Sequence, residues 1–444
     1  MRGGSSHPAV TGGDAIHLPA LGAPHRVART SGTSVGLASL LAVAPLDVNL
    51  LDGRFYAGDP YATYRRLRDE APAYWDPVSR VWGISRYDDV VAVEKDPARY
   101  TSAHGSRPRI MGDVSMINSD DPLHQNKRRL VARRFTPRSV KEHENHVRTV
   151  VTDLLDSFIA EGGGDVIRAL AAPLPARVIC ELLGFPTSLA EKCREWSELT
   201  MLQGGQYNPD GSDHEPTEEI MNAVLEFAGA ALEVLEARRA EPQDDLISVW
   251  AHGKVEFPDG VTRAMNDDEI VHEALLLLDG GAETTRTVIG TMCLELIRHP
   301  DQHAALVANP GILGATGVEE FIRWVTPILN MRRTATVDHD IHGKTVHAGD
   351  ELVLMYSSAN RDERVFHDPD TLDVTRPHNH HVAFGFGTHF CLGASLARLE
   401  IRVLFEELVQ RVPKMRLVAG ADPKKIPSAF ACAYHTIPVE LTGD

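Results

Sequence analysis

Closely spaced cysteines are absent from this sequence. Its five cysteines are odd in number, widely separated and contain no CxxC pair: Cys180, Cys193, Cys293, Cys391 and Cys432. This pattern argues against a disulfide framework, and against a structural zinc site, whose thiolate ligands usually come in close pairs. It favours a reducing compartment, and we expect the protein in the cytoplasm.

The sequence also lacks an excess of basic residues and a long apolar run. Asp and Glu outnumber Lys and Arg by 62 to 45, which gives a net charge of −17. We expect no nucleic-acid partner, because phosphate binding depends on a dominant basic surface. No apolar run reaches the ~18 residues that span a bilayer, so we expect no stable membrane anchor. Residues 35–46 have the composition of a signal-peptide core but lie unusually far from Met1 for one.

Composition divides the chain at about residue 46. Residues 1–46 are rich in Gly, Ala, Ser and Pro, and we expect a mobile N-terminal extension there. No later shift in composition divides the sequence. We therefore predict a single large domain over residues 47–444.

Beyond residue 46 the apolar residues recur mostly at three and four positions, which predicts a mainly α fold. The expected helices cover residues 59–71, 87–95, 122–134, 139–161, 167–183, 187–202, 216–239, 266–298, 315–326 and 394–411. Alternation typical of strands is confined to residues 73–85, 331–355 and 414–441. The longest helix opens with Asn266 and Glu269, a variant of the capping box. Its first half is apolar almost all round, so this helix should run through the interior.

One cysteine stands in a glycine-rich stretch, FGFGTHFCLG, at residues 384–393. Gly385, Gly387 and Gly393 permit positive backbone dihedrals and close approach by a large flat molecule. A helix that starts near Ala394 would point its N-terminal amides at Cys391 and favour a thiolate. These residues alone leave three roles open for Cys391: nucleophile, metal ligand and inert buried thiol.

The spacing within this stretch resembles the haem-ligand loop of the cytochrome P450 family. The matching positions are Phe384, Gly387, His389, Cys391 and Gly393. The resemblance implies the P450 fold with a minor β region, and haem b held between the long central helix and the cysteine-loop helix. It makes Cys391 the axial thiolate ligand of iron, which favours cleavage of the oxygen–oxygen bond. It also implies that His389 hydrogen-bonds a haem propionate.

The long helix contains the stretch GGAETT at residues 280–285. Paired glycines inside a helix cost about 1 kcal/mol each relative to alanine, so a specific need for space is expected. Close helix packing is one explanation. The family resemblance gives another, in which Gly281 contacts the haem and Glu283 and Thr284 form the acid–alcohol pair that delivers protons to bound dioxygen.

Two further motifs fit the same resemblance. Glu320 and Arg323 are spaced i,i+3, which usually gives a solvated surface pair. In the family this pair is buried and joins a downstream arginine, here Arg376, to brace the cysteine loop. His124 and Arg128 at i,i+4, with Arg333 of a later strand, match the cations that bind the haem propionates. Ordinary surface cations are the alternative for these last three residues.

The substrate is less closely defined by the sequence. Residues 47–77, 171–186 and 388–400 resemble actinobacterial enzymes that hydroxylate the side-chain terminus of cholesterol and cholestenone, so a sterol side chain is the leading substrate. A terpenoid, a macrolide or another secondary metabolite is the alternative. The candidate residues of the substrate cavity are Asp279, Gly280, Ile328, Leu329 and Phe430.

Asp279 departs from the family pattern, which usually has an aliphatic residue there. It lies four residues before Glu283, and like charges on one helix face raise at least one pKa. Asp279 either turns away to a buried cation or hydroxyl, or faces the cavity. The second orientation would favour a substrate with a hydroxyl or an amine.

The resemblance implies a monooxygenase that uses O2 and takes electrons from NAD(P)H through a reductase and a ferredoxin. We expect the ferredoxin to dock at the basic segment 127–138, whose cations are Lys127, Arg128, Arg129, Arg133, Arg134 and Arg138. An ordinary solvated cationic face is the alternative. A peroxide-using peroxygenase is a competing function, disfavoured by the Glu283–Thr284 pair. A hydrolase with Cys391 as nucleophile is another, and it would be colourless.

Overall fold

The computed structural model describes residues 45–108, 110, 112–203, 215–412 and 414–442. Residues 46–444 form one compact unit. The mobile extension predicted for residues 1–46 falls almost entirely on residues 1–44, which lie outside the described residues, and it stays a prediction.

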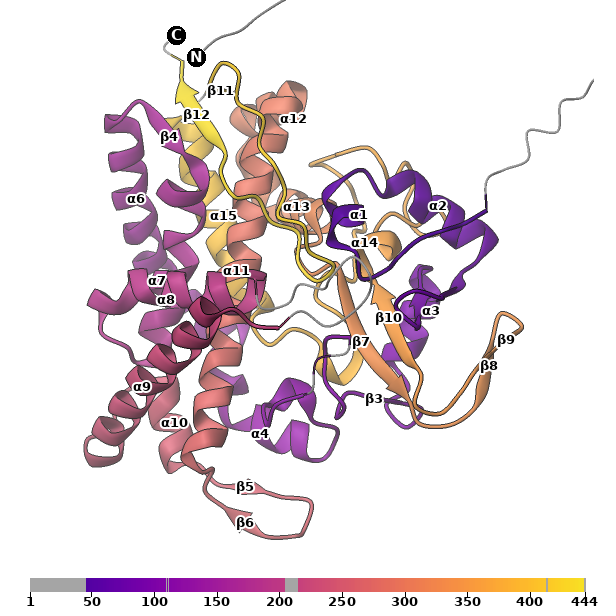
Figure 1. Ribbon diagram of the computed structural model, residues 1–444. Coiled ribbons are helices and arrows are strands. Elements are labelled where there is room, and N and C mark those ends of the chain that lie inside the picture. The colour runs from indigo at the N-terminus through magenta and orange to yellow at the C-terminus, as the bar shows by residue number, and fades with distance from the viewer. Residues whose placement is uncertain (1–44, 109, 111, 204–214, 413, 443–444) are drawn as a thin grey trace, which may run out of the picture. The chain divides into compact units, whose positions relative to one another are not determined.

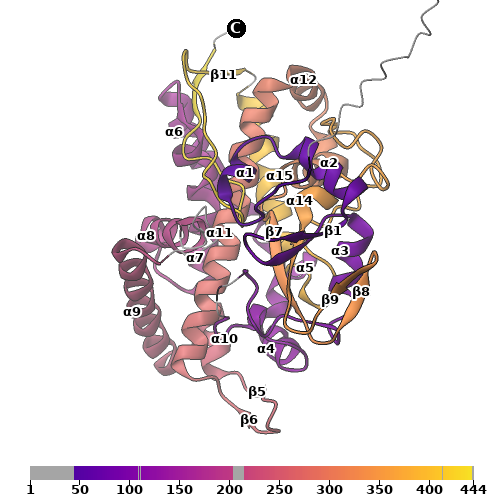
Figure 2. The same ribbon diagram turned by 45° about the vertical axis from the view of Figure 1, so that its right-hand side comes forward.

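The central element is α11 (Asp267–Arg298), a helix of 32 residues and therefore about 48 Å in length. Its capping box is confirmed: the Asn266 side chain accepts from the Glu269 amide at 2.8 Å, and the Glu269 carboxylate accepts from the Asn266 amide at 2.8 Å. The helix contacts α7, α8, α9, α13 and α15. Figures 1 and 2 show it in the middle of the helical part, with α9 and α10 beside its N-terminal half.

Helices dominate the described chain, as the periodicity predicts. The α-helices are α1 (Gly53–Ala57), α2 (Tyr61–Glu70), α3 (Tyr87–Glu94), α4 (Leu123–Val131), α5 (Pro137–Glu142), α6 (Glu144–Ala160), α7 (Pro173–Leu183), α8 (Ala190–Ser197), α9 (Glu218–Ala240), α10 (Leu246–His252), α11, α12 (Pro300–Ala308), α13 (Val318–Val325), α14 (Tyr356–Ala359) and α15 (Ala394–Arg411). Shorter 3-10 or π turns are η1 (Met116–Asn118), η2 (Ala132–Phe135), η3 (Ile167–Ala171), η4 (Thr187–Leu189), η5 (Glu198–Gln203), η6 (Leu313–Gly317) and η7 (Gly387–His389).

The strands form a minor β region. They are β1 (Ala73–Asp76), β2 (Val81–Ile84), β3 (Tyr100–Thr101), β4 (Gly163–Asp165), β5 (Val255–Glu256), β6 (Thr262–Arg263), β7 (Asn330–Ala335), β8 (His339–Ile341), β9 (Lys344–Val346), β10 (Glu351–Met355), β11 (Met415–Leu417) and β12 (Pro438–Leu441). The largest sheet has the order β1-β2-β10-β7-β3, and only its β2–β10 pair is parallel. Figure 1 shows this sheet beside the helices, and β3 pairs with the outer side of β7 at one edge.

Several predicted boundaries differ from the structure. The helix predicted over residues 139–161 is two helices, α5 and α6, that meet at His143. α5 starts early because Thr136 caps it, accepting from the Ser139 amide at 3.3 Å, and because Pro137 is favourable in the first turn. Helices α1, α10, α12 and α14 were not predicted. Three of them span seven residues or fewer, too few for a periodic pattern to show, whereas α12 has nine residues.

Most of the helices share one hydrophobic core around α11, and a second core lies on the five-stranded sheet. Trp250, Phe227 and Phe405 are among the large fully buried side chains of the first core. Within the described ranges, none of the helices combines the length and apolar character needed to cross a membrane.

Candidate active site

A cavity of about 880 Å³ lies between α11 and the loop that precedes α15. Most of the residues that line it are apolar, with Leu, Ile, Val, Met and Phe side chains, and a few polar residues lie among them. Eight of the nine residues predicted to contact the cofactor line this cavity: His124, Arg128, Gly281, Arg333, Phe384, His389, Cys391 and Gly393. Segments far apart in the sequence therefore meet where the motifs predicted.

The ninth residue, Gly387, does not line the cavity and forms the turn behind it. It begins the η7 turn with a φ of 68°. A Cβ at this position would lie 2.5 Å from the Glu94 carbonyl oxygen, so a side chain would clash with backbone as well as strain it. The structure gives Gly387 a role in the turn, where the sequence had predicted a cofactor contact.

Cys391 follows this turn and precedes α15, which starts at Ala394 as predicted. The Cys391 amide donates to the Phe384 carbonyl at 2.9 Å and so closes the loop. Burial raises the pKa of the Cys391 thiol, whereas the backbone N–H of Gly393 and the charge of Arg128 lower it. Because burial has the larger effect, a stable thiolate here needs a further positive charge, such as that of a bound metal ion.

Two guanidiniums, those of Arg128 and Arg333, and the His124 ring lie near His389 at the same cavity. The rings of His389 and His124 have centroids 4.1 Å apart, and Arg128 donates to the Phe390 carbonyl at 2.7 Å. Burial, and then the charges of Arg333 and His124, lower the pKa of His389 to about 3. This end of the cavity is therefore buried and electropositive, and it would be stabilised by a bound anion.

The strand β7 separates two adjacent arginines. Arg333 lines the cavity, whereas Arg332 forms an ion pair with Glu351 at 2.8 Å on the other face. Successive side chains of a strand point to opposite faces, which explains why only one of the two arginines reaches the cavity. That residue is Arg333, the one that the sequence analysis named.

Glu94 and Tyr356 belong to the same region and were missed by the sequence analysis. The Glu94 carboxylate accepts from the Tyr356 hydroxyl at 2.6 Å and from Arg333 at 3.2 Å. Burial raises the pKa of Glu94, and the charge of Arg333 opposes this. Both residues lie in regular elements without a motif, so only tertiary structure reveals them.

The paired glycines of α11 have separate explanations. A Cβ at Gly281 would lie 2.9 Å from Ile179 of α7, so this glycine permits close helix packing. A Cβ at Gly280 would meet no atom within 4 Å, because this residue borders the cavity. Thr284 also lines the cavity, and its hydroxyl donates to the Gly280 carbonyl at 2.8 Å.

Glu283 is turned away from the cavity. Its carboxylate forms an ion pair with Arg286 at 2.7 Å and accepts from the Ser197 hydroxyl at 3.0 Å. Burial raises its pKa, and Arg286 opposes that change. The geometry therefore brings Thr284 to the cavity, while the predicted acid of the pair is held behind α11 by a partner the sequence did not suggest.

Asp279 both faces the cavity and accepts a hydrogen bond from a hydroxyl, the two arrangements that the sequence analysis treated as alternatives. It lines the cavity, and its Oδ1 accepts from the Thr200 hydroxyl at 2.7 Å. Burial raises the pKa of Asp279 to about 7, while the charge of Arg107 and the Thr200 hydrogen bond lower it and the charge of Glu283 adds to the rise. The expected effect of the paired carboxylates is present but smaller than that of burial.

Four of the five candidate residues of the substrate cavity line it: Asp279, Gly280, Ile328 and Phe430. Leu329 was wrongly included. It packs instead with Val353 and Met355 in a separate apolar cluster. Extended backbone sends neighbouring side chains to opposite faces, so Ile328 and Leu329 cannot both face the cavity.

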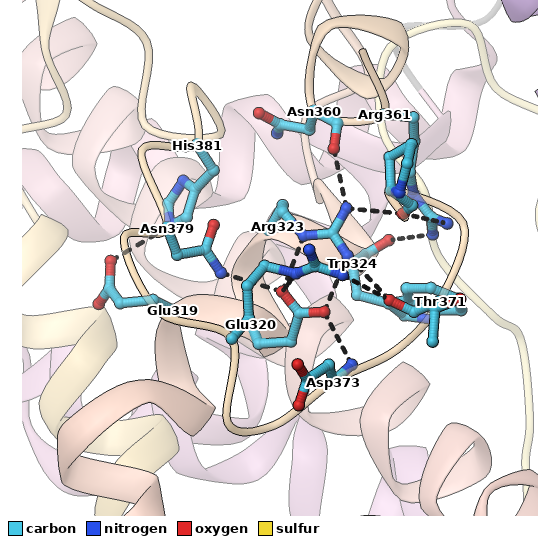
Figure 3. Close-up of polar contacts among 12 residues, drawn as sticks. Glu319, Glu320, Arg323, Trp324, Asn360, Arg361, Thr371, Asp373, Asn379 and His381 are labelled. Atoms are coloured by element: carbon cyan, nitrogen blue, oxygen red, sulfur yellow. Dashed lines mark hydrogen bonds and ion pairs between the residues drawn. The ribbon is translucent and has the colours of Figure 1, made fainter. Parts of the chain in front are cut away.

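The Glu320–Arg323 pair is fully buried rather than solvated (Figure 3). Glu320 binds Arg323 twice at 2.8 Å and accepts from the Asp373 amide at 3.0 Å and from Asn379 at 2.9 Å. Arg376 adds a further bond to Glu320 at 3.0 Å. Arg323 in turn donates to the Asn360 and Pro369 carbonyls at 2.9 Å. The cluster fixes the segment that leads into the cysteine loop.

The basic segment 127–138 is only partly available to a partner. Lys127 is buried and pairs with Glu273 at 3.3 Å, and Arg134 pairs with Asp244 at 2.6 Å. Arg128 faces the cavity. The exposed cations of the segment are Arg129, Arg133 and Arg138. The predicted surface is therefore smaller than the sequence suggested.

Comparison with known proteins identifies the family. Residues 315–440 match the family model described as Cytochrome P450. The chain is 38% identical over 397 residues, 89% of this chain and 96% of the relative, to a steroid C26-monooxygenase of Mycolicibacterium smegmatis. The chain belongs to the cytochrome P450 family. This P450 is also 36% identical to a methyl-branched lipid omega-hydroxylase of Mycobacterium bovis, with 89% of this chain and 92% of the relative covered.

Solved structures agree. A Bacillus megaterium P450 in complex with testosterone has a TM-score of 0.78 and 29% identity, with 87% of this chain and 99% of the other covered. A Mycobacterium marinum P450 in complex with pseudoionone has a TM-score of 0.80 and 29% identity, with 90% of this chain and 100% of the other covered. This protein is thus a haem-thiolate monooxygenase that uses haem b, and the hydrolase alternative is set aside.

The residues present fit haem. The cavity has a cysteine on one wall and a hydroxyl on the other, at Cys391 and Thr284. A Cβ at Gly280 or Gly393 would meet no atom within 4 Å, so the backbone leaves room for a large flat group on both walls. The electropositive end around His389 suits the two carboxylates of such a group.

Proposed function

We propose that this P450 inserts one oxygen atom of O2 into a C–H bond of a large hydrophobic substrate, and that a sterol side chain is the leading substrate class. The observation that carries the proposal is the mostly apolar cavity that holds both Cys391 and Thr284. The similarity to a steroid C26-monooxygenase supports the sterol. The similarity to a methyl-branched lipid omega-hydroxylase supports a branched acyl lipid as the second candidate.

In this proposal each residue has a defined task. Cys391 would bind the haem iron through its sulfur, and the bound haem would supply oxygen activation, which a thiolate ligand promotes by donating electron density. His124, Arg128, Arg333 and His389 hold the propionates. The Thr284 hydroxyl holds and transfers a proton at its Oγ, and the apolar lining keeps bulk water from the substrate.

The test of this function uses the haem-loaded protein. The reduced carbon monoxide complex should show the long-wavelength Soret band of thiolate ligation. Incubation with cholestenone, NAD(P)H, a ferredoxin and its reductase should then give a side-chain alcohol. A Soret band of the reduced carbon monoxide complex without this long-wavelength shift would contradict the assignment of Cys391 as the haem ligand. Equal product formation with hydrogen peroxide alone would favour a peroxygenase.

Thr284→Ala should keep consuming NAD(P)H while product formation falls, because removing the hydroxyl disturbs proton transfer without filling the cavity. We expect the ratio of product to NAD(P)H oxidised to fall by roughly tenfold or more, with hydrogen peroxide released instead. Thr284→Ser keeps the hydroxyl and should restore most of the ratio. An unchanged ratio in Thr284→Ala would contradict the role of Thr284.

We also propose that a ferredoxin delivers the electrons near the cysteine loop. Arg128 joins α4 to this loop through the Phe390 carbonyl, so the exposed cations of α4 and η2 lie on the segment next to it. The loop exposes two aromatic side chains, Phe386 (37%) and Phe390 (41%). Apolar groups beside cations suit a partner with an acidic rim, which the positive charges would steer.

Reversal of Arg129 and Arg133 to glutamate should slow the first electron transfer from ferredoxin by roughly tenfold at low ionic strength, because the steering charge changes sign. The dependence of the rate on salt should flatten. Substrate-induced spectral shifts should be unchanged. A Lys344→Glu/Lys414→Glu protein carries the same change in net charge at two other exposed positions, and it serves as the control. Equal rates in both double variants would place the docking site elsewhere.

A cytoplasmic location is part of the proposal. The five cysteines all lie among the described residues, and all are free thiols. Free thiols are typical of proteins that work in a reducing compartment.

A further inference from the structure

One wall of the apolar cavity carries a carboxylate, that of Asp279, to which the proposed oxygen insertion assigns no task. Asp279 lies within α11, and Thr200 of η5 donates its hydroxyl to Oδ1. Among the described residues, no group donates to Oδ2. The Thr200 hydrogen bond fixes the orientation of the carboxylate and leaves one oxygen for a ligand.

A guanidinium stands close to this carboxylate. Arg107 lines the same cavity and stacks on the Phe430 ring, with 4.1 Å from its central carbon to the ring centroid. It is near enough for its charge to act on Asp279. The two do not form a direct ion pair in the described part of the chain, and no described residue accepts a hydrogen bond from the Arg107 side chain. Among the described residues, a donor and an acceptor of the same cavity therefore remain available to a ligand.

The position of Asp279 along α11 sets a distance. Asp279 precedes Thr284 by five residues, and an α-helix rises 1.5 Å per residue, so the two side chains leave the helix roughly 7–8 Å apart along its axis. Thr284 marks the end of the cavity where oxygen insertion is proposed. A polar group bound at Asp279 would then be offset by roughly 7–8 Å along the helix axis from the Thr284 end of the cavity.

We propose that Asp279, oriented by Thr200 and accompanied by Arg107, binds a hydroxyl group of the substrate at a point in the cavity away from the carbon that is oxidised. The inference rests on the proposed monooxygenase function and makes alcohols its preferred substrate class. A hydroxyl is the group that satisfies both neighbours, because it can donate to the carboxylate and accept from the guanidinium.

Other ligand groups fit less well. A hydrocarbon would cover the carboxylate and the guanidinium without offering a hydrogen bond, which carries a desolvation cost. A ketone can accept from Arg107 but has nothing to donate to Asp279. An ammonium group can donate to Asp279 but is repelled by Arg107.

The position of Asp279 has a consequence for a sterol substrate. The oxygen on the sterol A ring lies at the opposite end of the molecule from the side-chain terminus, much farther away than the axial offset between Asp279 and Thr284. A hydroxyl on the side chain itself fits this offset better. A sterol that already carries a side-chain hydroxyl should therefore bind more tightly than one that does not.

The experiment measures dissociation constants of the haem-loaded protein by its spectral shift and by calorimetry. The first ligand set is limonene, perillyl alcohol and perillylamine, which share one skeleton and end in hydrogen, hydroxyl or ammonium. The second is cholesterol and 20-hydroxycholesterol. The proteins are the wild type, Asp279→Leu, Asp279→Asn and a control, Leu276→Met, which alters an apolar position of the same wall.

In the wild type and in Leu276→Met, we expect the alcohol of at least one set to bind roughly tenfold more tightly than its parent without that hydroxyl, the worth of a hydrogen bond to a charged group. Asp279→Leu should remove or reverse this preference, and Asp279→Asn should fall between. An equal preference in the wild type and Asp279→Leu would overturn the inference. The inference would also be overturned if perillylamine bound more tightly than perillyl alcohol and this preference were lost in Asp279→Leu.

Failure of the inference can be told from failure of the proposed function. If the reduced carbon monoxide complex lacks the thiolate band, the function fails whatever the ligand titrations show. If the band and cholestenone hydroxylation are present but no alcohol is preferred, the function stands and the assignment of Asp279 is wrong.

Discussion

Replacement of Cys391 by histidine is expected to abolish oxygen insertion while leaving haem bound. Imidazole is a good ligand of haem iron but donates less electron density than a thiolate, so it promotes cleavage of the oxygen–oxygen bond poorly. We expect turnover to fall on the order of a thousandfold or more, equivalent to about 4 kcal/mol of additional barrier.

The geometry around Cys391 makes this variant informative. The loop is closed by the bond from the Cys391 amide to the Phe384 carbonyl, which does not involve the side chain. The backbone can therefore keep its course when the side chain changes. Burial raises the pKa of the free thiol, whereas a bound metal ion would favour its thiolate form.

The measurement combines haem content, the reduced carbon monoxide spectrum and product formation with ferredoxin and NAD(P)H. Cys432→Ala removes a thiol that lies outside the cavity and controls for general effects of losing a cysteine. Haem content should stay near that of the wild type in both variants, and only Cys391→His should lose the long-wavelength band. Normal turnover by Cys391→His would contradict the assignment of the ligand.

The cysteine loop and the long helix could be predicted from sequence because their signals are local. Residues 384–393 carry the loop glycines, the histidine and the cysteine within ten positions. The capping box at Asn266 and the start of α15 at Ala394 were equally local and are confirmed. In such cases the chemistry of each residue depends mainly on its near neighbours in the chain.

The errors arose where a residue's role depends on a distant partner. Lys127 was placed with the basic segment because five other cations lie in it, but Glu273 of α11 binds it in the interior. Glu283 was expected at the oxygen site, but the distant Ser197, together with Arg286 of the next helical turn, binds it elsewhere. Helical periodicity gives the face of each residue only relative to its own helix, and it cannot say what packs against that face.

The polar groups of the cavity show the same limit. Arg107, Thr200 and Glu94 lie in three segments that the sequence analysis treated as ordinary, and none belongs to a motif. Their importance comes from meeting Asp279 and Arg333 in the folded chain. For this part of the site, the sequence offered one signal: Asp279 occupies a position where the family usually has an aliphatic residue.

Replacement of Glu320 by glutamine should have the largest effect on stability. Glu320 is fully buried, and its two oxygens accept bonds from Arg323, Arg376, Asn379 and the Asp373 amide. Glutamine has nearly the same shape but no charge, and its NH2 group would point a donor at groups that are themselves donors. Two buried arginines would lose the charge that compensates them.

Breaking a buried ion pair in this way costs about 3–5 kcal/mol, because the remaining charge stays in the interior. The adjacent Glu319 provides a matched control on the same helix. Its carboxylate binds Arg398 at 2.6 and 2.8 Å and lies 3.2 Å from the buried His381 ring, but Glu319 and Arg398 are themselves about a third exposed, at 31% and 36%. Glu319→Gln should therefore cost less than Glu320→Gln, because the arginine it leaves unpaired is partly solvated.

The cluster lies directly before the cysteine loop, so its loss should reach the cofactor. Arg323 holds the Asn360 and Pro369 carbonyls, and Asn379 of the segment entering the loop binds Glu320 itself (Figure 3). Urea titration of the haem-loaded proteins, followed by the Soret band and by circular dichroism, measures both effects. We expect Glu320→Gln to lose haem at a lower urea concentration than Glu319→Gln, and to unfold earlier. If the two variants lose haem together with the wild type, the cluster does not brace the loop.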